Sequence, residues 1–79
     1  MDEFIEKLAK MILFHRKKAK MTQLELAKLS GVGKTVIFDL ENGKKTVRLI
    51  TLFSILYTLN IKIHFQSPLM QKFEEYEKS

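Results

Sequence analysis

Apolar residues recur at intervals of three and four along the first part of the chain, which places them on one face of an α-helix. The run between residues 4 and 13 predicts a first helix that ends near Lys18. Asp2 is suited to cap this helix, because a carboxylate accepts hydrogen bonds from the unpaired N–H groups of a first turn. The last turn is cationic, which the negative end of a helix dipole favours.

Two shorter helices follow, joined by a glycine turn. Thr22 and Glu25 have the spacing of a capping box, in which each side chain binds the other residue's backbone N–H, so a helix should begin there. Gly31 permits a sharp turn after that helix, and Gly43 is expected to end the next one. Five apolar residues should form a buried ridge between the two helices: Leu26, Ala27, Val32, Ile37 and Leu40.

A fourth helix is predicted after Thr46, which can cap it. Its apolar positions keep the helical spacing as far as Leu59. Asn60 tolerates the left-handed backbone conformation in which many helices end. The predicted fold class is therefore all-α, a compact bundle of four main helices.

Residues 61–65 change the apolar period from helical to two, which predicts one C-terminal β-strand. Ile61, Ile63 and Phe65 share one face of this strand, and Pro68 lies shortly after it. A lone strand in a helical chain has no partner, and the simplest partner is the same strand of a second copy. We therefore expect a homodimer in which this strand pairs across a two-fold axis; the alternative is an extended tail without a partner.

The chain after Pro68 keeps apolar residues at helical spacing among charged ones, namely Leu69, Met70, Phe73 and Tyr76. This pattern fits either a short docking helix or a tail that stays disordered until it meets a partner, and we favour the disordered tail. The sequence thus divides into a domain over residues 1–66 and a C-terminal tail over residues 67–79.

Composition narrows the function. The 79 residues can hold one small domain, whose limited core makes dimerisation attractive. A net charge of +5 suits a polyanionic partner. The sequence has no cysteine for disulfides, no signal-peptide pattern, and no apolar run of the ~20 residues that a membrane span needs. We expect a cytoplasmic, nucleoid-associated protein.

The middle of the chain carries a series of short motifs in a fixed order: Thr22-Gln23, Leu26-Ala27, Gly31-Val32, Ile37, and Glu41-Asn42-Gly43. Together they resemble the Xre/Cro-type helix-turn-helix of phage repressors and bacterial regulators. The resemblance covers roughly residues 4–66. It implies a lambda-repressor-like bundle that binds double-stranded DNA.

This resemblance places the helix that begins near Gly33 in the DNA major groove, with Lys34, Thr35 and Asp39 as base-reading residues. Lys34 can donate to guanine O6 and N7, and Thr35 can meet a base with its hydroxyl or a thymine with its methyl group. Asp39 departs from the commoner polar or basic residue. Its carboxylate can accept from cytosine N4 or form a salt bridge to Lys34 or Lys45.

Phosphate contacts are implied on either side of that helix. Gln23 stands where the family's glutamine meets a phosphate, helped by the free N–H groups of its helix N-terminus. Asn42, Lys44 and Lys45 follow the reading helix and should also bind the DNA backbone. For any one of these lysines, a solvated surface charge is an equally good interpretation.

Arg16 and Glu41 match an ion pair of similar repressors, in which an arginine late in the first helix binds the glutamate of the Glu-Asn-Gly segment. The pair would tie the first helix to the end of the reading helix. We assign both residues to the scaffold, because loss of either partner of a largely buried pair leaves the other charge stranded.

Two apolar residues and two histidines stand out in the rest of the chain, and none of them indicates a catalytic or metal site. Leu24 and Phe38 are apolar where relatives carry polar side chains, and Phe38 could meet a thymine methyl, form a protein interface or simply extend the core. His15 and His64 lack the spacing of metal ligands. Neither a catalytic constellation nor a cofactor motif is recognisable, so we expect no enzymatic activity, no metal and no cofactor.

The segment from Thr46 to Phe65 resembles HipB-type antitoxins, which share its helix and closing strand. The resemblance implies a homodimer that binds a palindromic operator, represses its own operon and holds a HipA-like serine/threonine kinase toxin. The tail after Pro68 could contact that toxin or fold back over its own dimer. A stand-alone prophage or mobile-element regulator and a protein–protein adaptor are the alternatives.

Overall fold

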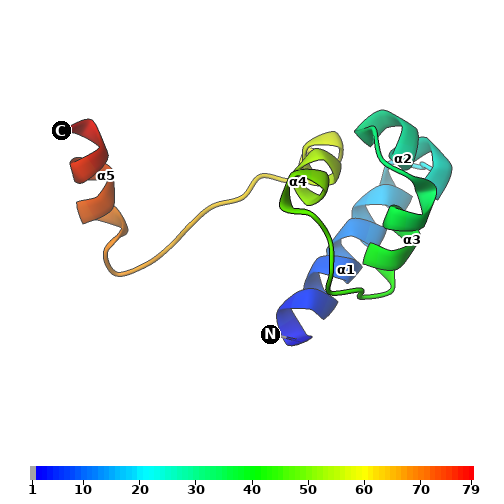
Figure 1. Cartoon of the computed structure of the whole chain (residues 1–79), viewed down its shortest axis with the longest axis horizontal. Coiled ribbons are helices and arrows are strands. Elements are labelled where there is room, and N and C mark those ends of the chain that lie inside the picture. The colour runs from blue at the N-terminus through cyan, green and yellow to red at the C-terminus, as the bar shows by residue number, and fades with distance from the viewer. Residues whose placement is uncertain (1) are drawn as a thin grey trace.

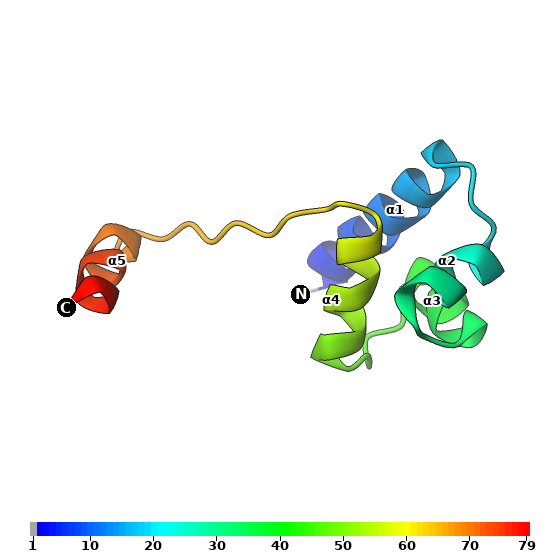
Figure 2. The ribbon, with the colours of Figure 1, turned by 90° about the horizontal axis from the view of Figure 1, so that it is seen from above.

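The computed structural model describes residues 2–79, and over these residues the chain forms five α-helices and no β-strand (Figure 1). Helices α1 to α4 pack into a bundle, whereas α5 stands apart at the end of an extended segment (Figures 1 and 2). None of these helices is both long and apolar enough to cross a membrane. The bounds are α1 Asp2–Lys18, α2 Gln23–Ser30, α3 Lys34–Glu41, α4 Leu49–Thr58 and α5 Met70–Lys78.

Each helix of the bundle contributes one completely buried side chain to the core, and these are Ile12, Leu26, Ile37 and Ile55. The ridge expected between α2 and α3 is confirmed, because Leu26, Ala27, Ile37 and Leu40 are buried and the half-buried Val32 packs against them. Truncation of a fully buried isoleucine or leucine to alanine typically costs about 2–5 kcal/mol. The small core therefore fixes the angle between the two helices.

All four bundle helices end in the same way. After α3, for example, the N–H of Gly43 donates to the carbonyl of Leu40 at 3.1 Å and the N–H of Lys44 to that of Asp39 at 2.9 Å. These two hydrogen bonds define a Schellman motif, which needs a left-handed residue at its centre. The left-handed residues that follow α1 to α4 are Lys20, Gly31, Gly43 and Asn60. The endings expected at Gly31, Gly43 and Asn60 are thus confirmed.

The predicted capping box at the start of α2 is also confirmed. The N–H of Glu25 donates to Thr22 Oγ1 at 3.0 Å, and the N–H of Thr22 donates to Glu25 Oε1 at 2.8 Å. The pKa of the Glu25 carboxyl lies below its ordinary value of 4.5. The main cause is the hydrogen bond from the Thr22 backbone, and the Thr22 side chain makes a smaller contribution. These two residues therefore mark the residue at which α2 begins.

Two other expected caps are wrong. Asp2 lies within the first turn of α1, and its carboxylate pairs with the ammonium group of Lys45 instead of capping the helix. Thr46 does not cap α4, which begins at Leu49 after an extended Arg48. The reason is Val47, which packs against the core and keeps the loop extended past the expected start.

Hydroxyl groups fix the end of α2 against α4. Ser54 Oγ donates to the carbonyl of Ser30, and Ser30 Oγ donates to Thr58 Oγ1 at 3.0 Å. Thr58 Oγ1 in turn donates to the carbonyl of Ser54 at 2.9 Å. The buried polar atoms between these helices are thereby satisfied, as a stable core requires.

The predicted strand over residues 61–65 is wrong for the single chain. Residues 61–67 are extended but belong to no sheet, because strand hydrogen bonds need a neighbouring strand and this chain supplies none within residues 2–79. Ile61 is half-buried against the core, whereas Ile63 and Phe65 are exposed. Pairing with a second copy stays a prediction.

The preference for a disordered tail is wrong as well, because residues 70–78 form α5. Glutamate, lysine, glutamine and methionine are good helix formers, which accounts for the helix at this end of the chain. Phe73 and Tyr76 of this helix form an exposed apolar stripe together with Leu69, the residue directly before it. The helical alternative is therefore the one the structure adopts.

Candidate DNA-binding surface

The turn between α2 and α3 leaves the start of α3 open to solvent. Gly33 precedes the helix and has no side chain with which to cap it. The first two helical residues, Lys34 and Thr35, are exposed. Over residues 2–79 neither side chain takes part in a hydrogen bond or ion pair within the chain. Unpaired N–H groups and a free cation therefore meet at this end of α3.

Asp39 lies four residues after Thr35, so the two side chains are neighbours on one face of α3. Lys44 Nζ donates to Asp39 Oδ2 at 3.2 Å. The alternatives considered from the sequence, a salt bridge to Lys34 or Lys45, are wrong. The Schellman turn explains the difference, because it folds Lys44 back beside the last turn of α3.

The four residues predicted to meet phosphates all have partners within the chain. Besides the ion pairs of Lys44 and Lys45, Gln23 Nε2 donates to Glu41 Oε1 at 3.0 Å, and Asn42 Nδ2 donates to the carbonyl of Phe38 at 2.8 Å. Both lysine side chains are more than half exposed. Exposed ion pairs contribute only about 0–1 kcal/mol, so a phosphate can replace either carboxylate at little cost.

Arg16, Gln23 and Glu41 form a network that joins three helices. Arg16 Nε donates to Glu41 Oε2 at 2.6 Å and Arg16 Nη2 donates to Glu41 Oε1 at 3.0 Å. The side chains are 11% and 4% exposed, respectively. Arg16 Nη1 also binds the carbonyl of Met21 at 2.9 Å, which fixes the loop before α2. The hydrogen bonds to Glu41 raise the pKa of Arg16 above its ordinary value, against the opposing effect of burial.

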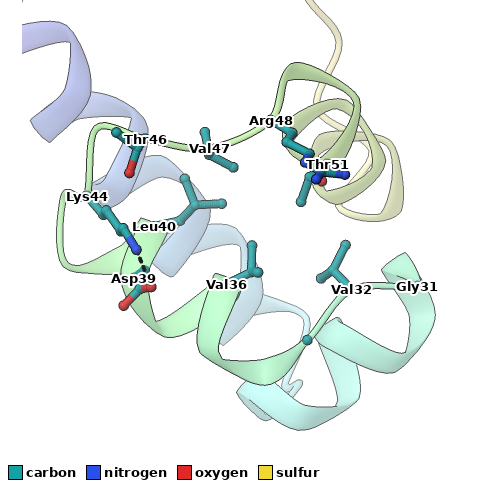
Figure 3. A pocket seen from close by; sticks show the side chains of 11 residues that line it. Gly31, Val32, Val36, Asp39, Leu40, Lys44, Thr46, Val47, Arg48 and Thr51 are labelled. Atoms are coloured by element: carbon teal, nitrogen blue, oxygen red, sulfur yellow. Dashed lines mark hydrogen bonds and ion pairs between the residues drawn. The ribbon is translucent and has the colours of Figure 1, made fainter.

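A groove of about 370 Å³ runs between α3 and the loop that leads to α4 (Figure 3). Val36 and Leu40 of α3 point into it, and the Asp39–Lys44 pair stands at one end. Arg48 and Thr51 lie at the other end, across from α3 (Figure 3). A further cation, the side chain of Arg48, therefore lies across this groove from α3.

Arg48 is not among the DNA-binding residues expected from the sequence. Its position beside α3 depends on the path of the extended loop from Lys44 to α4, which no local pattern predicts. The available signal was a third basic residue, three positions after Lys45 and directly before the next helix.

Phe38 and Leu24 are surface residues, with exposed fractions of 53% and 47%. The interpretation of Phe38 as an extension of the core is therefore wrong, and its ring is free for a contact outside the chain. His15 Nδ1 lies 2.6 Å from the carbonyl of Met11, and His64 is exposed. No group of histidine, aspartate or glutamate side chains within residues 2–79 has the arrangement of a metal site.

Comparison with known proteins agrees with this geometry. Residues 15–66 match the helix-turn-helix family, and the chain belongs to it. The chain is also similar to y4mF of Sinorhizobium fredii (strain NBRC 101917 / NGR234), an uncharacterized HTH-type transcriptional regulator. The two are 40% identical over 53 residues, which are 67% of this chain and 70% of the relative.

Proposed function

We propose that the protein is a transcriptional repressor that binds a palindromic DNA operator as a homodimer. The observation that carries this proposal is the start of α3, where Lys34 and Thr35 are exposed and unpaired within residues 2–79 while the end of the helix is held by Arg16 and Glu41. A rigid helix with free donors at its N-terminus suits the major groove. Membership of the helix-turn-helix family supports the same function.

We propose that the residues of this surface have two different roles, base recognition and phosphate binding. Lys34, Thr35 and Asp39 read bases, with Lys34 donating to guanine and Asp39 accepting from cytosine N4. Gln23, Asn42, Lys44 and Lys45 bind phosphates, and we add Arg48, which lies across the groove from α3. The phosphate contacts supply affinity that does not depend on sequence.

Dimerisation is proposed to use residues 61–65. Ile63 and Phe65 are exposed, and with Phe53 and Tyr57 of α4 they line an apolar groove of about 600 Å³. Pairing of the extended segments of two chains would satisfy their backbone groups and cover these side chains. Two reading helices about one DNA turn (~34 Å) apart would then meet two half-sites.

We further propose that the protein acts as the antitoxin of a HipBA-like operon and neutralises a HipA-like serine/threonine kinase. The support is the resemblance of residues 46–65 to HipB-type antitoxins. Co-expression with a kinase-like protein encoded beside the gene tests this step. A stable complex that suppresses the toxicity supports it, whereas a toxin that is neither bound nor suppressed leaves a stand-alone regulator.

Titration of DNA from upstream of the protein's own gene tests the main proposal. We expect tight binding that falls linearly on a plot of log affinity against log salt, and a clear preference over random DNA of equal length. Equal affinity for both DNAs at every salt concentration contradicts a sequence-specific repressor. Absence of DNA binding would favour a protein–protein adaptor.

A further inference from the structure

Helix α5 needs a surface that its own bundle does not provide. It has nine residues, fewer than the ~12–15 at which an isolated helix becomes marginally stable in water. Its apolar stripe, formed by Leu69, Phe73 and Tyr76, is exposed, and α5 lies away from the bundle in both views (Figures 1 and 2). Most helical stability in proteins comes from packing of such a stripe.

The outer face of α1 offers a matching surface. Phe14 projects from it with an exposed ring, and a hollow lies on either side of that ring. One hollow, of about 380 Å³, also includes Met11, and the other, of about 500 Å³, also includes Leu13. We call these two hollows and the ring between them the α1 groove. Side chains spaced along one face of a helix can enter such paired hollows.

The charges along the two helices are complementary in one orientation. The rim of the α1 groove is acidic at Glu3 and Glu6 and basic from there on along the helix, at Lys7, Lys10, Lys17 and Lys18. In α5, Lys72 comes first, Glu74, Glu75 and Glu77 follow, and Lys78 is the last residue of the helix. Lys72 and Glu77 flank the apolar stripe on opposite sides, since they lie three residues from Leu69 and four from Phe73. Parallel packing therefore brings opposite charges together, and antiparallel packing brings like charges together.

We infer that α5 is an exchanged arm, which docks parallel to α1 in the α1 groove of a second copy of this chain. The inference rests on the proposed homodimer, because pairing of residues 61–65 holds the linker extended and directs α5 away from its own α1. Nine residues separate Asn60, which follows α4, from Met70, the first residue of α5, and an extended chain of that length reaches ~30 Å. The arm adds an apolar contact to a dimer whose individual cores are small.

Cysteine cross-linking tests the arm directly, because the chain contains no cysteine of its own. A chain carrying Lys10→Cys is mixed with a differently tagged full-length chain carrying Glu77→Cys and oxidised mildly. The matched control replaces Glu77→Cys by Gln71→Cys, which lies on the opposite side of α5 from the stripe. We expect about tenfold more mixed disulfide with Glu77→Cys than with Gln71→Cys, since docking raises the effective concentration of the two thiols.

Equal yields from the two positions overturn the inference. A chain carrying both Lys10→Cys and Glu77→Cys, oxidised in an excess of wild-type protein, should give little internally cross-linked monomer. A large yield of that monomer means that α5 docks on its own chain, which also overturns it. Charge reversal gives a second measure: Lys10→Glu with Lys17→Glu should weaken dimerisation, and addition of Glu77→Lys should restore part of the loss.

The chain that ends at Ser67 separates this inference from the proposed function. It retains the whole core, since every buried residue precedes Asn60, so we expect it to fold and to bind operator DNA as a weaker dimer. If the protein binds operator DNA but Glu77→Cys shows no preferential cross-linking, the exchanged arm is refuted and the proposed function is not. A full-length chain that neither dimerises nor prefers operator DNA refutes the proposed function as well. If the truncated chain dimerises as tightly as the full-length chain but no longer binds the kinase-like protein, α5 serves that partner instead and the arm is refuted.

Discussion

Glu41, the last residue of α3, accepts hydrogen bonds from Nε and Nη2 of Arg16 in α1, at 2.6 and 3.0 Å. The same carboxylate accepts a third hydrogen bond from Gln23 at the start of α2. One buried carboxylate thus holds three helices together at the end of α3 that lies away from Lys34 and Thr35. The hydrogen bonds to Glu41 raise the pKa of Arg16, so the ion pair favours the charged guanidinium.

A double-mutant cycle measures this contact. Arg16→Met and Glu41→Leu should each lower the free energy of unfolding by ~3–5 kcal/mol, because each leaves a buried charge without its partner. The double variant should lose much less than the sum, which urea denaturation can establish. Asp39→Asn, which removes a more exposed ion pair, should cost only about 0–1 kcal/mol. Additive losses at Arg16 and Glu41 would show that the two side chains act independently.

Lys20 adopts a left-handed backbone conformation, with φ of 58°. A side chain in this region clashes with the backbone, and glycine does not, so Lys20→Gly should stabilise the protein by about 1 kcal/mol. Lys17→Gly is the matched control, since it places glycine at a right-handed position in the last turn of α1 and should destabilise by up to about 1 kcal/mol. Thermal unfolding of both variants checks the signs. A loss of stability in Lys20→Gly would contradict the assigned ending of α1.

The capping box should give a specific pH dependence. The folded-state pKa of Glu25 is below 4.5, so the folded state favours the charged carboxylate. The resulting stability is present above pH 4.5 and disappears as the pH falls through the lower, folded-state pKa. Glu25→Gln keeps an oxygen acceptor but removes this charge. We expect the melting temperatures of the two proteins to differ most above pH 5 and to converge as the pH falls through the folded-state pKa of Glu25, while Glu74→Gln follows wild type throughout.

Proline variants test the role of residues 61–65 in the dimer. Successive backbone N–H groups point to opposite sides of an extended chain, so either Lys62→Pro or Ile63→Pro removes a donor from the intermolecular pairing. At least one should shift the protein toward monomer and weaken binding to a palindromic site, with the helical circular dichroism preserved. Ile63→Val keeps the strand propensity and should remain dimeric. Unchanged sedimentation of both proline variants removes this segment from the interface.

Local chemistry made much of the fold predictable from the sequence. Thr22 and Glu25 set the start of α2 through contacts three residues apart, and Gly31 and Asn60 end their helices through their own backbone preferences. The ion pair between Arg16 and Glu41 spans 25 positions and was expected only from the family resemblance. Its presence in the structure illustrates what a resemblance adds to local rules.

The remaining features depend on the path of the chain. The start of α4 is set by Val47, whose packing against the core outweighs the capping preference of Thr46. Asp39 meets Lys44, and not Lys34 or Lys45, because the turn after α3 doubles back. The alternating pattern of residues 61–65 is typical of a strand, but a strand needs a neighbouring strand, and within residues 2–79 the segment is extended without one.

The central claim, that the start of α3 reads bases, is tested most directly by Lys34→Ala. The best site is first selected from random DNA, and affinities for that site and for random DNA are then measured at fixed salt. We predict a loss of ~1–3 kcal/mol on the selected site with relaxed preference at one base pair, and a much smaller loss on random DNA. Lys44→Ala should weaken both DNAs alike and flatten the salt dependence, and Lys28→Ala, in the last turn of α2, should change neither. An equal loss on selected and random DNA in Lys34→Ala would contradict the account.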